Sequence, residues 1–218
     1  GAAAALSPRS RDGTPAPLPD PADLDVDAYL TVRLPATFAA VHRALTLAAV
    51  AAPDLTPRRL LDVGTGPGTA VWAATAVWPS IDDVTAVEPA ARFRSAAAAL
   101  AVDGPPALRA AAWPPDLAAA SGHDLVTATY VLGELDDPIA AAVGLWERTS
   151  AVLALVEPGT PDAAARLGEV RAALVDLGAH VVFPCPHAGP CPYVVGEVPA
   201  GAPGWCHASV RVARSRRH

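Results

Sequence analysis

The sequence predicts an α/β fold with a doubly wound, mostly parallel sheet. Segments with the apolar spacing of helices alternate with short apolar segments between residues 58 and 183. Strands that alternate with helices at this spacing are typical of a parallel sheet covered by helices. The first expected strand also runs into a glycine-rich turn and then a helix. With 218 residues and 52% hydrophobic content, the chain can bury a sizeable core.

Six strands and four helices are expected in this region. The expected strands are residues 59–63, 84–88, 107–112, 124–130, 152–157 and 180–183. The expected helices are residues 69–77, 89–100, 138–149 and 161–177. Pro161 stands in the first turn of the last helix, where proline is tolerated.

The segments that flank the sheet differ in composition. Residues 1–26 are rich in Ala, Pro, Ser and Asp, which predicts a flexible N-terminal arm. Residues 27–57 are an N-terminal helical segment, because the apolar residues of 26–52 keep helical spacing. Pro35 should begin a second helix and leave Leu34 extended. Residues 58–183 then form the main domain, and 184–218 form a cysteine-rich segment with a basic tail.

Composition excludes several classes of protein. The formal charge of −6 argues against a uniformly basic nucleic-acid binder. No apolar run is expected to span a bilayer, and no signal peptide opens the chain, so no membrane partner is expected. Three cysteines without an export signal favour a reduced compartment, the bacterial cytoplasm, over a disulfide framework. The absence of methionine and the basic C-terminal run suggest a piece of a longer protein.

The glycine turn carries a ligand-binding pattern. Gly64, Gly66 and Gly68 follow the strand of residues 59–63, and glycine lets a backbone turn tightly and approach a ligand. Asp62 stands two residues before the first glycine. Glu88 closes the next strand, where an acid can bind a ribose diol. The alternative is an α/β turn that binds no ligand.

The glycine spacing differs from the dinucleotide fingerprint. The third glycine comes one residue early, and the D-x-G-x-G-x-G pattern resembles motif I of S-adenosylmethionine-dependent methyltransferases. This resemblance implies a Rossmann-like methyltransferase sheet. In it Gly64, Thr65 and Gly66 wrap the methionine moiety and Glu88 holds the ribose hydroxyls. Trp113, after the third expected strand, would stack on adenine or serve only in packing.

No catalytic residue is identified. The D/N-P-P-Y/F tetrad of base N-methyltransferases is missing after the strand of residues 124–130, and no cysteine stands at a strand end as cytosine C5 chemistry requires. Tyr130 and Glu134 can contact an acceptor, although Glu134 is more simply a solvated residue. Asp136 and Asp137 precede Pro138 and most simply cap the following helix.

All three cysteines lie near the C-terminus: Cys185, Cys191 and Cys206. Neighbouring prolines stiffen these loops, and thiolates select zinc, copper(I) or iron–sulfur. Cys185 and Cys191 are too far apart for a C-x-x-C knuckle. An iron–sulfur cluster tolerates longer loops, whereas His187 and His207 can complete a zinc site. Three free thiols in the core are the remaining alternative.

Six blocks occur in an order that resembles the methyltransferase-like small-ribosomal-subunit protein family. They are residues 34–41, 61–69, 130–135, 156–161, 184–192 and 205–207. The resemblance implies S-adenosylmethionine binding, contact with small-subunit rRNA during ribosome assembly, and a [4Fe–4S] cluster. Cys185, Cys191 and Cys206 match three cluster ligands, and the fourth is absent. The basic run Arg211, Arg214, Arg216 and Arg217 matches a basic family segment and is either an RNA contact or a solvated tail.

The expected function is an S-adenosylmethionine-binding, methyltransferase-like assembly factor of the small ribosomal subunit, monomeric away from the ribosome. Its S-adenosylmethionine and its cluster would be structural or sensory. One alternative is an active rRNA methyltransferase with its acceptor over Tyr130 and Glu134. The other is a small-molecule methyltransferase with a structural zinc, which the negative charge favours slightly.

Overall fold

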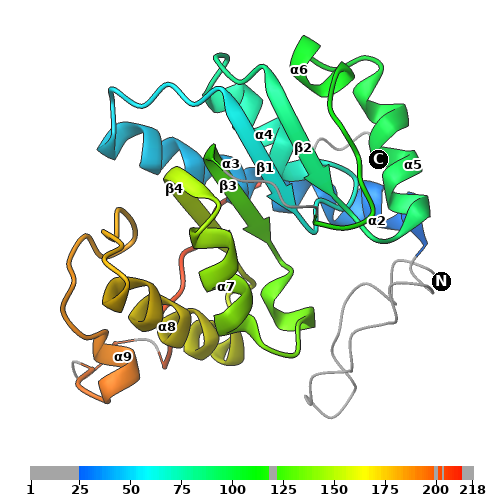
Figure 1. Cartoon of the computed structure of the whole chain (residues 1–218). Coiled ribbons are helices and arrows are strands. Elements are labelled where there is room, and N and C mark those ends of the chain that lie inside the picture. Colours follow the sequence, from blue (N-terminus) through cyan, green and yellow to red (C-terminus); the bar gives the residue numbers. More distant parts are fainter. Residues whose placement is uncertain (1–24, 118–121, 199–200, 203, 213–218) are drawn as a thin grey trace.

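The computed structural model describes residues 25–117, 122–198, 201–202 and 204–212. In this part of the chain four strands form one sheet in the order β2-β1-β3-β4, and every neighbouring pair is parallel (Figure 1). The strands are β1 (Arg59–Val63), β2 (Asp83–Val87), β3 (His123–Thr129) and β4 (Thr149–Val156). The expected parallel α/β architecture is confirmed for the described residues.

Helices connect the strands and precede the sheet. Before the sheet come α2 (Val26–Val32) and α3 (Leu34–Ala51), and between the strands lie α4 (Thr69–Val77), α5 (Ala91–Ala101), α6 (Pro106–Arg109), η2 (Leu132–Glu134) and α7 (Pro138–Trp146). After the sheet follow α8 (Pro161–Asp176) and α9 (Pro192–Val195). The α2–α3 boundary falls near Pro35 as predicted, but Leu34 is the first residue of α3 rather than extended, with proline inside its first turn.

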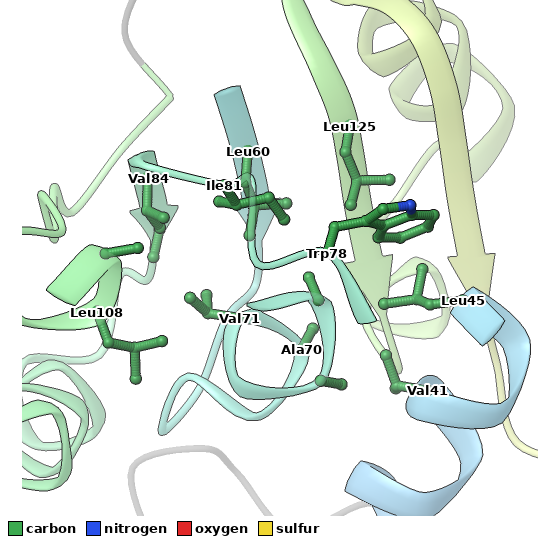
Figure 2. Close-up of a cluster of buried hydrophobic side chains, with 14 of the residues drawn as sticks. Val41, Leu45, Leu60, Ala70, Val71, Trp78, Ile81, Val84, Leu108 and Leu125 are labelled. Atoms are coloured by element: carbon green, nitrogen blue, oxygen red, sulfur yellow. The ribbon is translucent and has the colours of Figure 1, made fainter. Parts of the chain in front are cut away.

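The two faces of the sheet bury separate sets of side chains. Leu60 of β1 and Leu125 of β3 pack with Val41 and Leu45 of α3 and with α4 in one cluster (Figure 2). Their neighbours Leu61 and Val126 join a second cluster that includes Leu145 of α7. Successive side chains of a strand point to opposite faces, so helices cover both sides. This layering leaves the carboxyl ends of the strands as the edge where connecting turns gather.

Helix α3 bears on the expectation that no apolar run of the chain is long and apolar enough to span a bilayer. Among the described helices it is long and apolar enough to cross a membrane by length and composition. Its residues Val41 and Leu45 are fully buried, and the helix packs on α4. The core helix of a globular domain passes the same test, so this is weak evidence for a membrane span.

The strand predicted at residues 107–112 is wrong. Residues Pro106–Arg109 form the short helix α6, because Pro105 and Pro106 favour a helix start. Only Ala112 pairs with β2, through an isolated parallel bridge to Thr85. Pro114 and Pro115 follow closely and have no N–H to extend a ladder.

The strand predicted at residues 180–183 is also wrong. These residues have no helix or strand assignment, and Val182 and Phe183 are exposed. Pro184 follows directly and cannot donate to a ladder. Within the described residues β4 is therefore an edge strand. Nearly all of the predicted arm, residues 1–26, lies outside the described residues.

Candidate functional site

The glycine loop lies at the carboxyl end of β1 and leads into α4. Gly64, Gly66 and Gly68 all have positive φ, at 68°, 55° and 84°, and Gly68 is the N-cap of α4. The amides of Gly64 and Thr65 donate to the carbonyl of Val87 at 2.9 and 3.0 Å. These bonds tie the loop to the end of β2. The predicted strand, turn and helix therefore occur at the predicted residues.

Asp62 lies inside the protein rather than in the open loop. Its side chain is fully buried, and it accepts hydrogen bonds from Thr65 Oγ1 at 2.5 Å and Thr127 Oγ1 at 2.6 Å. Burial raises the pKa of Asp62 to about 6, against the lowering effect of the two hydroxyls. Asp62 thus links the first turn of the loop to β3.

Glu88 joins the loop to the start of α5. Its Oε2 accepts from the Gly66 amide at 2.9 Å, and its Oε1 accepts from the Ala90 amide at 2.8 Å. Arg94 donates to the carbonyls of Glu88 and Pro89, both at 2.6 Å. Each carboxylate oxygen keeps a second lone pair for another donor. The acid predicted to close β2 thus stands beside the middle glycine.

The middle of the loop is open on one side. A Cβ atom placed on Gly66 would meet nothing within 4 Å, whereas one placed on Gly68 would lie 3.2 Å from the Trp113 ring. Trp113 also packs against the core cluster on the α4 face. The predicted stacking residue therefore borders the loop and serves in packing, and the open space lies over Gly66.

The turn that contains Tyr130 and Glu134, the two residues expected to contact an acceptor, borders the same loop. Tyr130 follows β3 with φ of 60°, which is unusual for a residue other than glycine. A Cβ atom on Gly64 would lie 2.6 Å from Cγ2 of Val131, so this valine lies directly against the loop. Glu157, at the end of β4, accepts from the Leu132 amide at 3.0 Å. Two family-like blocks, residues 130–135 and 156–161, had marked these segments without indicating this contact.

Helix α2 also contributes to this end of the sheet. The ring of Tyr29 packs edge-on against Phe93 of α5, with centroids 5.3 Å apart. Burial raises the pKa of Tyr29, and the charge of Arg33 opposes this shift. Desolvation, followed by the charges of Glu88 and Glu157, raises the pKa of Glu134. No motif in the sequence pointed to Tyr29, because the contact depends on how α2 folds back.

One cavity of about 280 Å³ lies beside α7, and Gly66 is not among the residues that line it. Its lining is almost entirely apolar: Val63, Leu117, Val131, Leu135, Ala141, Gly144, Leu145 and Arg148. Apart from Arg148, these side chains offer no donors or acceptors for a polar ligand. The cavity therefore does not match the chemistry predicted for the loop.

The cysteine segment packs on α8 and returns to the sheet. Val194 of α9 lies against Gly168, and the indole of Trp205 donates to the carbonyl of Gly159 at 2.9 Å. The Cys206 thiol has a raised pKa, chiefly through desolvation and further through Cys185 and Cys191.

The three cysteines are unpaired thiols, and none is fully buried, which excludes three thiols in the core. Among the described residues no three His, Cys, Asp or Glu side chains are arranged to hold a metal ion. His187 and His207 are both exposed. Of the basic run, Arg211 is exposed, and Arg214, Arg216 and Arg217 lie outside the described residues. The predicted metal ligands therefore share one segment without forming a site.

Comparison with protein families gives a match over most of the chain. Residues 23–218 match the family described as mitochondrial small ribosomal subunit Rsm22. The chain belongs to the Rsm22 family. This membership confirms the resemblance to methyltransferase-like proteins of the small ribosomal subunit.

A human relative of this Rsm22-family chain is the mitochondrial ribosome assembly protein METTL17. The two are 30% identical over 183 residues, which cover 75% of this chain and 40% of the human protein. The chain thus spans well under half the length of the curated relative that it matches.

Solved structures support the fold of this Rsm22-family chain. The plantazolicin methyltransferase BpumL in complex with SAH has a TM-score of 0.53 and 18% identity, covering 69% of this chain and 58% of its own. A second BpumL complex, with a triazolic desmethylPZN analog and SAH, has a TM-score of 0.50, 16% identity and coverage of 68% and 57%. The sheet and its helices are therefore those of a methyltransferase-type fold.

Proposed function

We propose that this chain is an S-adenosylmethionine-binding domain of a small-ribosomal-subunit assembly factor. The observation that carries the proposal is the Gly66 region, where an open face of the backbone lies beside the carboxylate of Glu88. Membership of the Rsm22 family and the methyltransferase-type fold point in the same direction. BpumL, which shares the fold, was solved with SAH, the demethylated form of the same cofactor.

The residues around the loop fit such a ligand. Glu88 retains acceptor capacity for ribose hydroxyls, and Gly66 leaves room for close approach to the backbone. Thr69 begins α4 with a buried hydroxyl that has no hydrogen-bond partner among the described residues. Gly64, Thr65 and Gly68 shape the loop, and Asp62 fixes it from inside. When bound, S-adenosylmethionine would supply an activated methyl group.

A matched pair of glycine substitutions tests the binding proposal. Gly66→Ala places a methyl group in the open space, and its strained backbone costs about 1 kcal/mol of stability. Gly178→Ala has the same kind of cost, because Gly178 has φ of 90° and open space, but it follows α8. Titration calorimetry with SAH should show binding to the wild type and Gly178→Ala, and at least about tenfold weaker binding to Gly66→Ala. Equal affinities of all three proteins would contradict the site.

Association with the small ribosomal subunit is the second part of the proposal. It rests on the Rsm22 family and on METTL17, whose name describes a ribosome assembly protein. The chain should sediment with small-subunit precursors, and binding to small-subunit rRNA should weaken as salt rises, as phosphate contacts require. If the chain stays in the free-protein fractions at low salt with precursors present, this part of the proposal is contradicted.

We also propose that Cys185, Cys191 and Cys206 bind a [4Fe–4S] cluster, with zinc as the alternative metal. The thiols share one segment and influence the pKa of Cys206, which supports a common ligand. Because these residues do not form a site as they stand, the segment must rearrange around the metal. Iron, sulfide and zinc analysis after anaerobic purification separates the alternatives. Metal at less than a tenth of an equivalent would contradict both.

Methyl transfer is a second candidate activity. Tyr130 supports it through its left-handed backbone at the strand end, since strained residues cluster at functional sites. In this version Tyr130 and Glu134 would contact the acceptor. Incubation of small-subunit rRNA with labelled S-adenosylmethionine tests the activity. Label that appears with wild type and is lost with Gly66→Ala would establish it, and absence of label would leave an assembly factor without transfer.

A further inference from the structure

The turn of residues 130–133 forms one wall of the glycine loop. Val131 lies so close to Gly64 that a Cβ atom there would be 2.6 Å from its Cγ2 and 2.9 Å from its Cβ. Any shift of this valine therefore changes the space beside the first glycine. The position of the turn therefore affects the shape of the proposed ligand site as well as the fold.

The same turn has an unfavourable backbone. Tyr130 adopts φ of 60°, a left-handed backbone that is unfavourable for a residue with a Cβ. The amide of Tyr130 still continues the sheet, since it donates to the carbonyl of Val156 at 2.7 Å. A strained residue of this kind persists only where its surroundings hold it in place. Something beyond Tyr130 must therefore fix the next residues.

Glu157 supplies the fixing contacts. Thr129 and Val156 are partners in the β3–β4 register, so the residues that follow them, Tyr130 and Glu157, leave the sheet side by side. The carboxylate accepts from the Leu132 amide at 3.0 Å, and the amides of Val131 and Gly133 interact with it as well. Three successive N–H groups around one anion form a small backbone nest.

The carboxylate is buried and paired. The Glu157 side chain is 1% exposed, and Arg166 of α8 donates to its Oε2 at 3.2 Å. A buried carboxylate is costly unless it is paired and hydrogen-bonded. Arg166 also covers the turn, because a Cβ atom on Gly133 would lie 3.1 Å from its guanidinium. The pair and the turn are thus packed as one unit.

We propose that Glu157, held by Arg166, is a positioning residue for the cofactor site. Glu157 anchors the turn of residues 130–133, and this turn places Val131 against Gly64. The proposal rests on the proposed binding of S-adenosylmethionine at the glycine loop, and Glu157 itself need not touch the ligand. It gives a role to a block of residues that the sequence singled out only as part of a resemblance.

Three variants test the proposal. Glu157→Ala removes the acceptor for the Leu132 amide, and Glu157→Gln keeps an acceptor oxygen but removes the charge. Val41→Ala is the control, because Val41 is fully buried in α3 on the opposite face of the sheet and lowers stability without touching the turn. Affinity for SAH is measured by calorimetry, and amide hydrogen exchange is measured for the segment that contains Leu132.

The expected results separate positioning from stability. Glu157→Ala should weaken SAH binding about tenfold and speed exchange at Leu132, and Glu157→Gln should stay within about threefold of the wild type. Val41→Ala should change neither readout while it lowers the melting temperature. Unchanged affinity of Glu157→Ala, with a wild type that binds, overturns only the positioning role. A wild type that binds no SAH overturns the proposed function and the role built on it.

Should Glu157→Ala fail to fold, Glu157→Gln combined with Arg166→Gln decides the question. The single Glu157→Gln variant leaves the Arg166 charge without its partner, whereas the double variant removes both charges and keeps an acceptor. The double variant should bind SAH more weakly than Glu157→Gln and exchange faster at Leu132, because Arg166 no longer holds residue 157 and no longer covers the turn. Equal affinity and equal exchange of the two variants overturn the proposal.

Discussion

The glycine loop and the cysteine segment both carry conspicuous sequence motifs, yet the structure treats them differently. In the loop each motif residue is bound to a different element: Asp62 to β3 through Thr127, Glu88 to the Gly66 amide, and Gly64 to the end of β2. In the cysteine segment the thiols are half-buried or exposed. Strand pairing and a helix start therefore arrange the first motif before any ligand arrives. The second motif supplies ligands that packing has not arranged.

The cysteine segment is nonetheless fixed to the domain at several points. Trp205 bonds to Gly159, Arg171 of α8 bonds to the carbonyl of His187, and Val194 packs on Gly168. None of these contacts comes from a thiol. The segment is therefore placed by its neighbours, and its cysteines remain available for a metal.

The largest effect is expected at Gly64, where the loop is already packed. Gly64→Ala adds a Cβ within 3 Å of Val131 and also forces a left-handed backbone on alanine. Backbone strain and overpacking together should lower the free energy of unfolding by about 2–4 kcal/mol. Urea unfolding measures the loss, with Gly66→Ala as the control that has only the backbone cost. Equal losses for the two variants would show that Val131 does not limit the loop.

Asp62 provides the next largest effect, through pH. Its pKa is raised to about 6 by burial, so the folded state holds a proton that the unfolded chain releases near pH 4. The protonated Asp62 therefore stabilises the folded state most below pH 4. This stabilisation falls as pH rises and is lost above about pH 6. The change is of the order of 2–3 kcal/mol.

Asp62→Asn isolates this contribution, because an amide does not titrate. The stability of the wild type relative to Asp62→Asn should fall between pH 4 and pH 7, as measured by urea unfolding at each pH. Only the slope is compared, since the amide changes the bonds to Thr65 and Thr127 at every pH. Parallel stability curves would mean that the Asp62 pKa is not raised.

Much of the structure around the glycine loop could be predicted from the sequence, for a physical reason. A glycine pattern after a strand, an acid at the end of the next strand and a helix after the turn are all local signals. The helix at residues 69–77 and the strand at residues 59–63 match the structure at both ends. The strands predicted at 107–112 and 180–183 were wrong, although the flanking Pro105, Pro106 and Pro184 are local signals against a strand.

Contacts between segments that are distant in the chain could not be predicted from the sequence. Tyr29 meets Phe93 only because α2 folds onto α5, and Glu157 meets Leu132 only because β3 and β4 are neighbours in register. The left-handed backbone of Tyr130 is likewise invisible in the sequence, since tyrosine rarely adopts it. Both Tyr130 and Glu157 lie within family-like blocks. The blocks mark both residues as family-like but do not indicate which contacts they make.

A smaller effect on stability is expected at Tyr130, in the turn that packs against the glycine loop. Tyr130→Gly relieves the strain of a positive φ, whereas Tyr130→Ala retains it, and both remove the ring. The glycine variant should be more stable than the alanine variant by about 1 kcal/mol, since only glycine adopts this backbone freely. Thermal unfolding of the two variants measures the difference. Greater stability of the alanine variant would show that the turn of residues 130–133 does not hold this conformation in solution.

The smallest effect is expected from the thiols in metal-free protein. Cys185→Ser, Cys191→Ser and Cys206→Ser should each change the free energy of unfolding by less than about 0.5 kcal/mol, because none of the three residues is fully buried. In anaerobically purified, metal-loaded protein the same substitutions should lower the melting temperature and the metal content together, since ligand loss removes binding energy from the folded state. A large loss in the metal-free protein would show that the thiols pack as core residues. In that case the cysteine segment would be as pre-arranged as the glycine loop, and the contrast between the two regions would disappear.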